Sequence, residues 1–140
     1  MPRWLRSVLA VAVGCVVWFA VATMGNWAMR SFVPGYADVE KTMNFSLTML
    51  LLRLVLGAAA SLVAGMVSAA IAPRAQFPIY ALALILVALF VPVHLGLWDT
   101  FPVWYHVLFL GTLVPLVMLG AWLLNTRGTR QLSSDLTLRP

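Results

Sequence analysis

Few side chains in this 140-residue sequence could do chemistry within or beside its long apolar runs. Arg53 is the one charged residue inside such a run, and Asn26, His94, Asp99 and His106 lie near the ends of the others. Arginine and asparagine can attract an anion, whereas imidazole and carboxylate groups suit zinc. Which chemistry is available depends on the elements that position these residues.

Four apolar runs account for most of the chain. The sequence is 63% hydrophobic and 9% charged, whereas soluble domains carry about 25% charged residues. A bilayer core about 30 Å thick requires roughly 20 helical residues, and helices satisfy the backbone hydrogen bonds that lipid cannot. We therefore predict an all-α integral membrane four-helix bundle, arranged up-down-up-down. It would form one transmembrane domain over residues 1–140, with spans at about 4–24, 45–72, 77–96 and 103–124.

Basic residues outside these runs are concentrated on one side of the predicted membrane. That side holds Arg3, Arg6, Arg74, Arg127, Arg130 and Arg139, and the other holds Arg30 and Lys41, offset by Asp38 and Glu40. The positive-inside rule then places both termini in the cytoplasm. The protein would lie in the bacterial inner membrane, with an outer loop at 25–44 and a cytoplasmic tail at 125–140. The first run resembles a secretory signal, but its length favours a retained helix.

The connections between the spans differ in length. Residues 73–76 predict a tight inner turn and residues 97–102 a short outer one. In the longer outer loop, Pro34-Gly35 indicates a turn, and Asp38 could cap a helix that continues into the second span. Gly128 is the predicted end of the last helix. Pro92 predicts a bend or the end of the third span, and Pro115 predicts a bend in the fourth.

Counting about 20 residues outward from the inner end of each span places four polar residues at one level. Asn26, Arg53, His94 and His106 share that level, and Asp99 lies in the loop above them. This pattern predicts a water-accessible polar pocket at the outer face. In the alternative, Arg53 extends to lipid phosphate, and the histidines are interfacial like the neighbouring tryptophans.

We expect no metal, cofactor or catalytic residue. His94, Asp99 and His106 lack the tight spacing of a zinc motif, and Arg53 would repel a cation. Ser61 and Ser68 lie too deep to use either histidine as a base.

Small residues recur every four positions along the second span, at Gly57, Ser61, Gly65 and Ala69. Such a stripe lets helices approach closely in lipid. It would serve either the bundle or a homodimer, and the central place of this span in the chain favours the bundle.

These features favour a small non-catalytic integral membrane protein with an accessory or scaffolding role. One alternative is an oligomeric transporter or channel subunit for an anion or small solute, because arginine and asparagine would face the outside. Another is a membrane enzyme that uses His94 and His106 at the outer interface. The expected partners are the lipid bilayer and another membrane protein or a second copy. Nucleic acid is not expected, because the basic residues are scattered.

Overall fold

The computed structural model describes the backbone of residues 1–137 and the side chains of residues 1–126. The regular structure in this part of the chain is helical. Its elements are α1 (Arg3–Phe32), α2 (Tyr36–Thr42), α3 (Leu47–Ile71), α4 (Gln76–Gly96) and α5 (Val103–Thr137).

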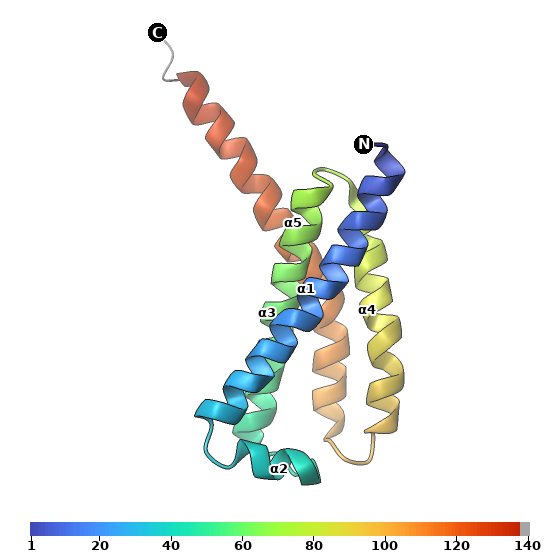
Figure 1. Cartoon of the computed structure of the whole chain (residues 1–140), viewed down its shortest axis with the longest axis vertical. Helices are drawn as coiled ribbons and strands as arrows, with labels where there is room; N and C mark the ends of the chain where they lie inside the picture. Colours follow the sequence, from blue (N-terminus) through green and yellow to red (C-terminus); the bar gives the residue numbers. More distant parts are fainter. Residues whose placement is uncertain (138–140) are drawn as a thin grey trace.

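The four long helices run alternately up and down, and the short α2 lies across one end of them (Figure 1). The α4–α5 turn lies at this same end, which we call the α2 end. The N-terminus and the α3–α4 turn lie at the opposite end, which we call the basic end because Arg3, Arg6 and Arg74 belong to it. All four long helices are apolar enough and long enough to cross a membrane.

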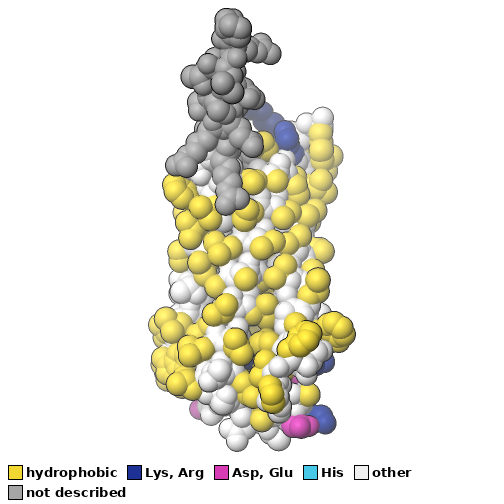
Figure 2. Space-filling model, turned by 90° about the vertical axis from the view of Figure 1, so that its left-hand side faces the viewer, with side chains coloured by type: hydrophobic (Ala, Val, Ile, Leu, Met, Phe, Trp, Pro, Cys, Tyr) yellow, Lys and Arg dark blue, Asp and Glu magenta, His cyan; other side chains and the backbone are white. Residues whose placement is uncertain are grey.

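A belt of exposed apolar side chains surrounds the bundle between its two ends. Val16, Val55, Leu84 and Val107 come from four different helices, and each is more than 60% exposed. Figure 2 shows hydrophobic side chains along the length of one face, with basic side chains near both ends and acidic ones only near the α2 end in this view. An apolar surface of this extent marks a protein that contacts lipid or another protein.

Helix α3 is the central packing element, with α5 and α1 against it. A Cβ atom added at Gly65 would lie 2.0 Å from the carbonyl oxygen of Val117 on α5. A Cβ atom at Gly120 would lie 2.1 Å from the carbonyl oxygen of Leu62 on α3. The backbones of α3 and α5 therefore approach each other closely where glycine removes the side chain.

The small-residue stripe of α3 faces two neighbouring helices. Gly57 lies against the Phe109 ring of α5, and Ser61 accepts a hydrogen bond from Nε1 of Trp18 on α1 at 3.0 Å. Ala69 is buried in the main hydrophobic core. In this chain the stripe thus packs within the bundle.

The prediction for residues 25–44 is wrong in two respects. First, α1 continues through residues 25–32 and ends before Pro34, where Val33 is extended because a residue before proline avoids helical angles. Second, α2 does not continue into α3. Met43 has a φ of 56° and ends α2, and Ser46 starts α3 by accepting a hydrogen bond from the Met49 N–H. Asp38 lies in the first turn of α2, whose N-cap is Gly35.

One predicted helix end is also wrong. Helix α5 continues through Gly128 to Thr137, so part of the predicted 125–140 tail is helical and the expected stop at Gly128 is wrong. Pro92 and Pro115 both lie inside helices that continue beyond them. Residues 138–140 of the predicted tail lie outside the described part of the chain.

Candidate functional site

Three of the five predicted polar residues line one cavity of about 340 Å³ near the α2 end. Asn26 reaches it from α1, Arg53 from α3 and His94 from α4. His106 is 1% exposed and lies behind His94. Asp99 is exposed in the α4–α5 turn and does not line the cavity.

The rest of this Arg53 cavity is mainly aromatic and aliphatic. Its rings are Trp18, Phe19, Phe90, Phe101, Tyr105 and Phe109. Phe19 of α1 is 43% exposed and Val93 of α4 is 49% exposed, so the cavity opens sideways between these two helices. An apolar cavity of this size with a few polar groups at one end is typical of small-molecule sites.

Arg53 is held by contacts from the segment that precedes its helix. Its guanidinium donates a hydrogen bond to the Tyr36 hydroxyl at 2.7 Å, and its Cζ lies 4.8 Å from the centre of the Phe45 ring. Tyr36 is fully buried and donates to Oδ1 of Asn26 at 2.8 Å. Burial raises the pKa of Tyr36, so at neutral pH its hydroxyl keeps the proton that this second bond needs.

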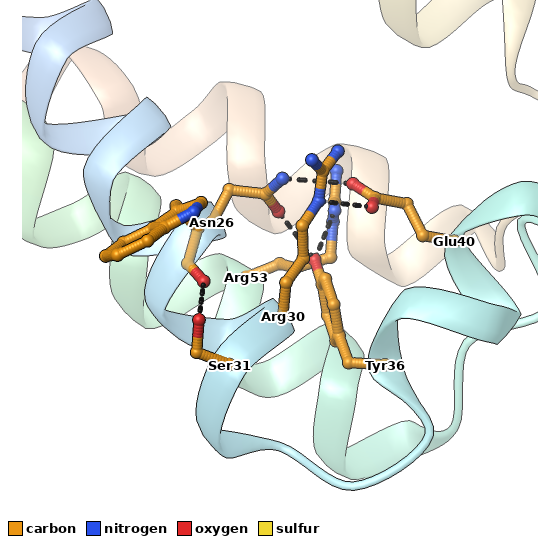
Figure 3. A network of polar contacts seen from close by, with 7 residues as sticks. Asn26, Arg30, Ser31, Tyr36, Glu40 and Arg53 are labelled. Carbon is orange, nitrogen blue, oxygen red and sulfur yellow. Dashed lines mark hydrogen bonds and ion pairs between the residues drawn. The ribbon is translucent and has the colours of Figure 1, made fainter.

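Glu40 connects this network to α1 (Figure 3). Its Oε1 accepts a hydrogen bond from Nδ2 of Asn26 at 3.0 Å, and its Oε2 forms an ion pair with Nε of Arg30 at 2.6 Å. The hydrogen bond from Arg30 is the main reason why the pKa of Glu40 lies below its ordinary value. Both the oxygen and the nitrogen of the Asn26 side-chain amide are therefore hydrogen-bonded within the protein.

The network carries an excess of positive charge. Arg30 forms an ion pair with Glu40 at 2.6 Å. The close contacts of Arg53, in contrast, are the Tyr36 hydroxyl and the Phe45 ring, which are both uncharged. Tyr105, which also lines the cavity, lies close enough to interact with the Arg53 guanidinium. A partly buried guanidinium that borders an apolar cavity without a contacting carboxylate favours an anionic or oxygen-rich ligand.

His94 and His106 form a buried pair, with their Nδ1 atoms 2.7 Å apart. One proton must lie between these atoms, and Nε2 of His106 is buried without a hydrogen-bond partner. An unpaired lone pair is tolerated better in the interior than an unpaired N–H, which places the shared proton on His106. His94 then carries its own proton on Nε2 and adds a second donor to the residues that line the cavity.

Several residues of the site give no signal in the sequence. Aromatic side chains are expected at a membrane interface, which is where the sequence places Tyr36, Phe45 and Tyr105. The sequence likewise suggests only a solvated carboxylate at Glu40. Their roles depend on α2 folding back over the end of α1, which no local pattern indicates.

Metal ligands and serine hydroxyls can be located in the described part of the chain. No group of three or more histidine, cysteine, aspartate or glutamate side chains lies close enough within this part of the chain to hold a metal ion. Ser61 accepts from Trp18 and donates to the Gly57 carbonyl at 2.8 Å, so its hydroxyl is already engaged in packing.

Comparison with known proteins gives no functional assignment, because the chain matches no protein family, curated protein or solved structure. The class of protein therefore rests on its fold: a helical protein with four long apolar helices that suggest a membrane protein.

Proposed function

We propose that this chain is a non-catalytic integral membrane protein that holds one amphiphilic molecule in the Arg53 cavity. It crosses the bilayer four times with both termini in the cytoplasm, so that the α2 end faces outward. The single observation that carries the proposal is the apolar cavity of about 340 Å³ with the Arg53 guanidinium at its wall. An accessory role, in which the protein presents or senses this molecule, fits such a site.

Two features support the membrane orientation. The exposed apolar belt lies between the two ends of the bundle, and the basic end carries Arg3, Arg6 and Arg74. The α2 end carries Asp38, Glu40 and Asp99, which offset its basic residues. An excess of arginine faces the cytoplasm in inner-membrane proteins.

Thiol labelling of intact cells tests this orientation. In a Cys15→Ala background, a membrane-impermeant maleimide should label Lys41→Cys at the α2 end before lysis. Arg74→Cys in the α3–α4 turn should react only after lysis, because the bilayer shields it. Labelling of Arg74→Cys in intact cells would reverse the assigned orientation.

The chemistry of the ligand follows from the cavity wall. Arg53 and His94 supply hydrogen-bond donors, whereas Asn26 is engaged by Tyr36 and Glu40. The remaining surface is mainly apolar, apart from the hydroxyl groups of Thr23 and Tyr105, and opens between α1 and α4 toward the belt. A molecule with an anionic or carbonyl headgroup and a hydrophobic body would satisfy both parts, and it could enter from the lipid without crossing the polar network.

Mass spectrometry of the purified protein tests this function. The wild type in mild detergent should retain about one equivalent of such an amphiphile. Arg53→Met should lose most of it, because removing one charged hydrogen bond costs about 1.5–3 kcal/mol, or roughly 10-fold to 150-fold in affinity. Arg53→Lys should retain an intermediate amount, because the charge remains but the planar guanidinium does not.

Two further variants separate local from general effects. Ala22→Phe fills the cavity from α1 without removing a polar group and should also lose the ligand. Lys41→Met removes an exposed positive charge at the same end and should retain it. A wild type that carries no amphiphile, or equal retention by all variants, would contradict the proposal.

A further inference from the structure

Two further hollows lie at the basic end, outside the Arg53 site. One is a basic pocket of about 500 Å³, lined by Arg3, Arg6, Ser7, Arg74 and the α3–α4 turn. The other is an apolar groove of about 680 Å³ between α1 and α4. Ser7 lines both, so the two hollows adjoin at this residue.

We propose that these adjoining hollows form a binding site for one anionic phospholipid. Its phosphate lies among the arginines of the basic pocket, and an acyl chain follows the apolar groove toward the middle of the bundle. Ser7 stands at the junction, where the ester groups of a phospholipid would lie. The site requires insertion in a bilayer but does not depend on a ligand in the Arg53 cavity.

Charge complementarity supports an anionic headgroup. The described carboxylates Asp38, Glu40 and Asp99 lie in α2 and the α4–α5 turn, at the opposite end of the bundle. The Nε–H of Arg6 donates a hydrogen bond to the Ile71 carbonyl oxygen at 2.5 Å, which fixes the guanidinium beside the α3–α4 turn. Each basic residue near a membrane surface contributes about 1 kcal/mol to binding of anionic lipid.

The backbone at this corner adds to the positive potential. Helix α1 begins at Arg3 and α4 at Gln76, and neither has a side-chain cap or an acidic residue in its first turn. The N-terminus of a helix carries a partial positive charge that favours phosphate. Two such termini border the basic pocket, since Arg3 and Ala75 both line it.

The groove supplies the complementary apolar part. Trp4, Val8 and Val11 form its α1 wall, and Phe77, Ala81 and Ile85 form its α4 wall. Trp4 is 68% exposed and Phe77 is 74% exposed, and both stand next to the basic pocket along their helices. Aromatic residues in this position are typical of the bilayer interface.

Native mass spectrometry of the full chain with added lipid tests this site. Wild-type protein should bind one phosphatidylglycerol more tightly than phosphatidylcholine. The double variant Arg3→Gln/Arg74→Gln should weaken phosphatidylglycerol binding by roughly 30-fold, from two lost charges. Arg6 is left in place because its bond to Ile71 also completes the end of α3.

Three comparisons make the result decisive. Lys41→Gln removes an exposed charge from the α2 end and should leave binding within about 2-fold of wild type. Ala81→Trp fills the groove without changing charge and should also weaken binding of the lipid. Inorganic phosphate at the same concentration should not compete. Competition by phosphate, no effect of Ala81→Trp, or a loss in Lys41→Gln as large as in Arg3→Gln/Arg74→Gln would overturn the proposal.

Discussion

Gly65→Ala should lower the thermal unfolding temperature of the purified protein, although it adds one methyl group. The new Cβ would lie 2.0 Å from the Val117 carbonyl oxygen. A backbone oxygen in the middle of α5 cannot rotate away as the tip of a side chain can, so α3 and α5 must separate. Overpacking of this kind typically costs about 1–3 kcal/mol, and the lost contacts are those that hold helices together in lipid. Thermal unfolding in detergent micelles measures the change.

The same substitution elsewhere provides the control. Gly111 lies within α5 with nothing in reach of an added Cβ, so Gly111→Ala should be neutral or stabilising by up to about 1 kcal/mol. Gly120→Ala should resemble Gly65→Ala, because its Cβ would meet the Leu62 carbonyl oxygen. Light scattering adds a second readout. A change of oligomeric state with unchanged unfolding would mean that the stripe serves a homodimer instead of the bundle.

Tyr36→Phe should release α2 from the bundle, because it removes only the hydroxyl that bridges Arg53 and Asn26. The ring stays buried, so the loss of stability would come from the missing hydrogen bonds and not from changed packing. A hydrogen bond to a charged group is worth about 1.5–3 kcal/mol, and the variant also leaves the Asn26 carbonyl oxygen without its donor. Hydrogen exchange should accelerate in α2, and the unfolding temperature should fall.

Tyr80→Phe is the matched control, since Tyr80 is 46% exposed on α4. It should change neither the unfolding temperature nor the exchange rate of α2. If the two tyrosine variants behave alike, the Tyr36 hydroxyl does not organise this end of the bundle.

The main elements can be predicted from the sequence because their signal is large and local. Each apolar run is long enough to form a full helix, and turn residues interrupt the pattern where the chain reverses. Depth along a helix is also readable, because each residue adds about 1.5 Å to its length. That regular rise explains why counting along the spans picks out Asn26, Arg53 and His94, which then line one cavity.

The remaining features depend on contacts between segments that no local pattern reports. The break between α2 and α3 falls at Met43, a residue type that rarely adopts a positive φ. Asp99 is at the expected end of the bundle, but the α4–α5 turn leaves it exposed. Helix α5 passes through Gly128 because a single glycine weakens a helix without ending it.

Helix α4 forms one wall of both the Arg53 cavity and the apolar groove, and it reaches from one end of the bundle to the other. The opposite wall, α1, is pinned to α3 near its start by Arg6 and at mid-length by Trp18. A sideways displacement of α4 would therefore reshape two hollows that lie toward opposite ends of the bundle. Only a ligand that moved α4 would change the affinity of the other hollow, and such linkage would act equally in both directions.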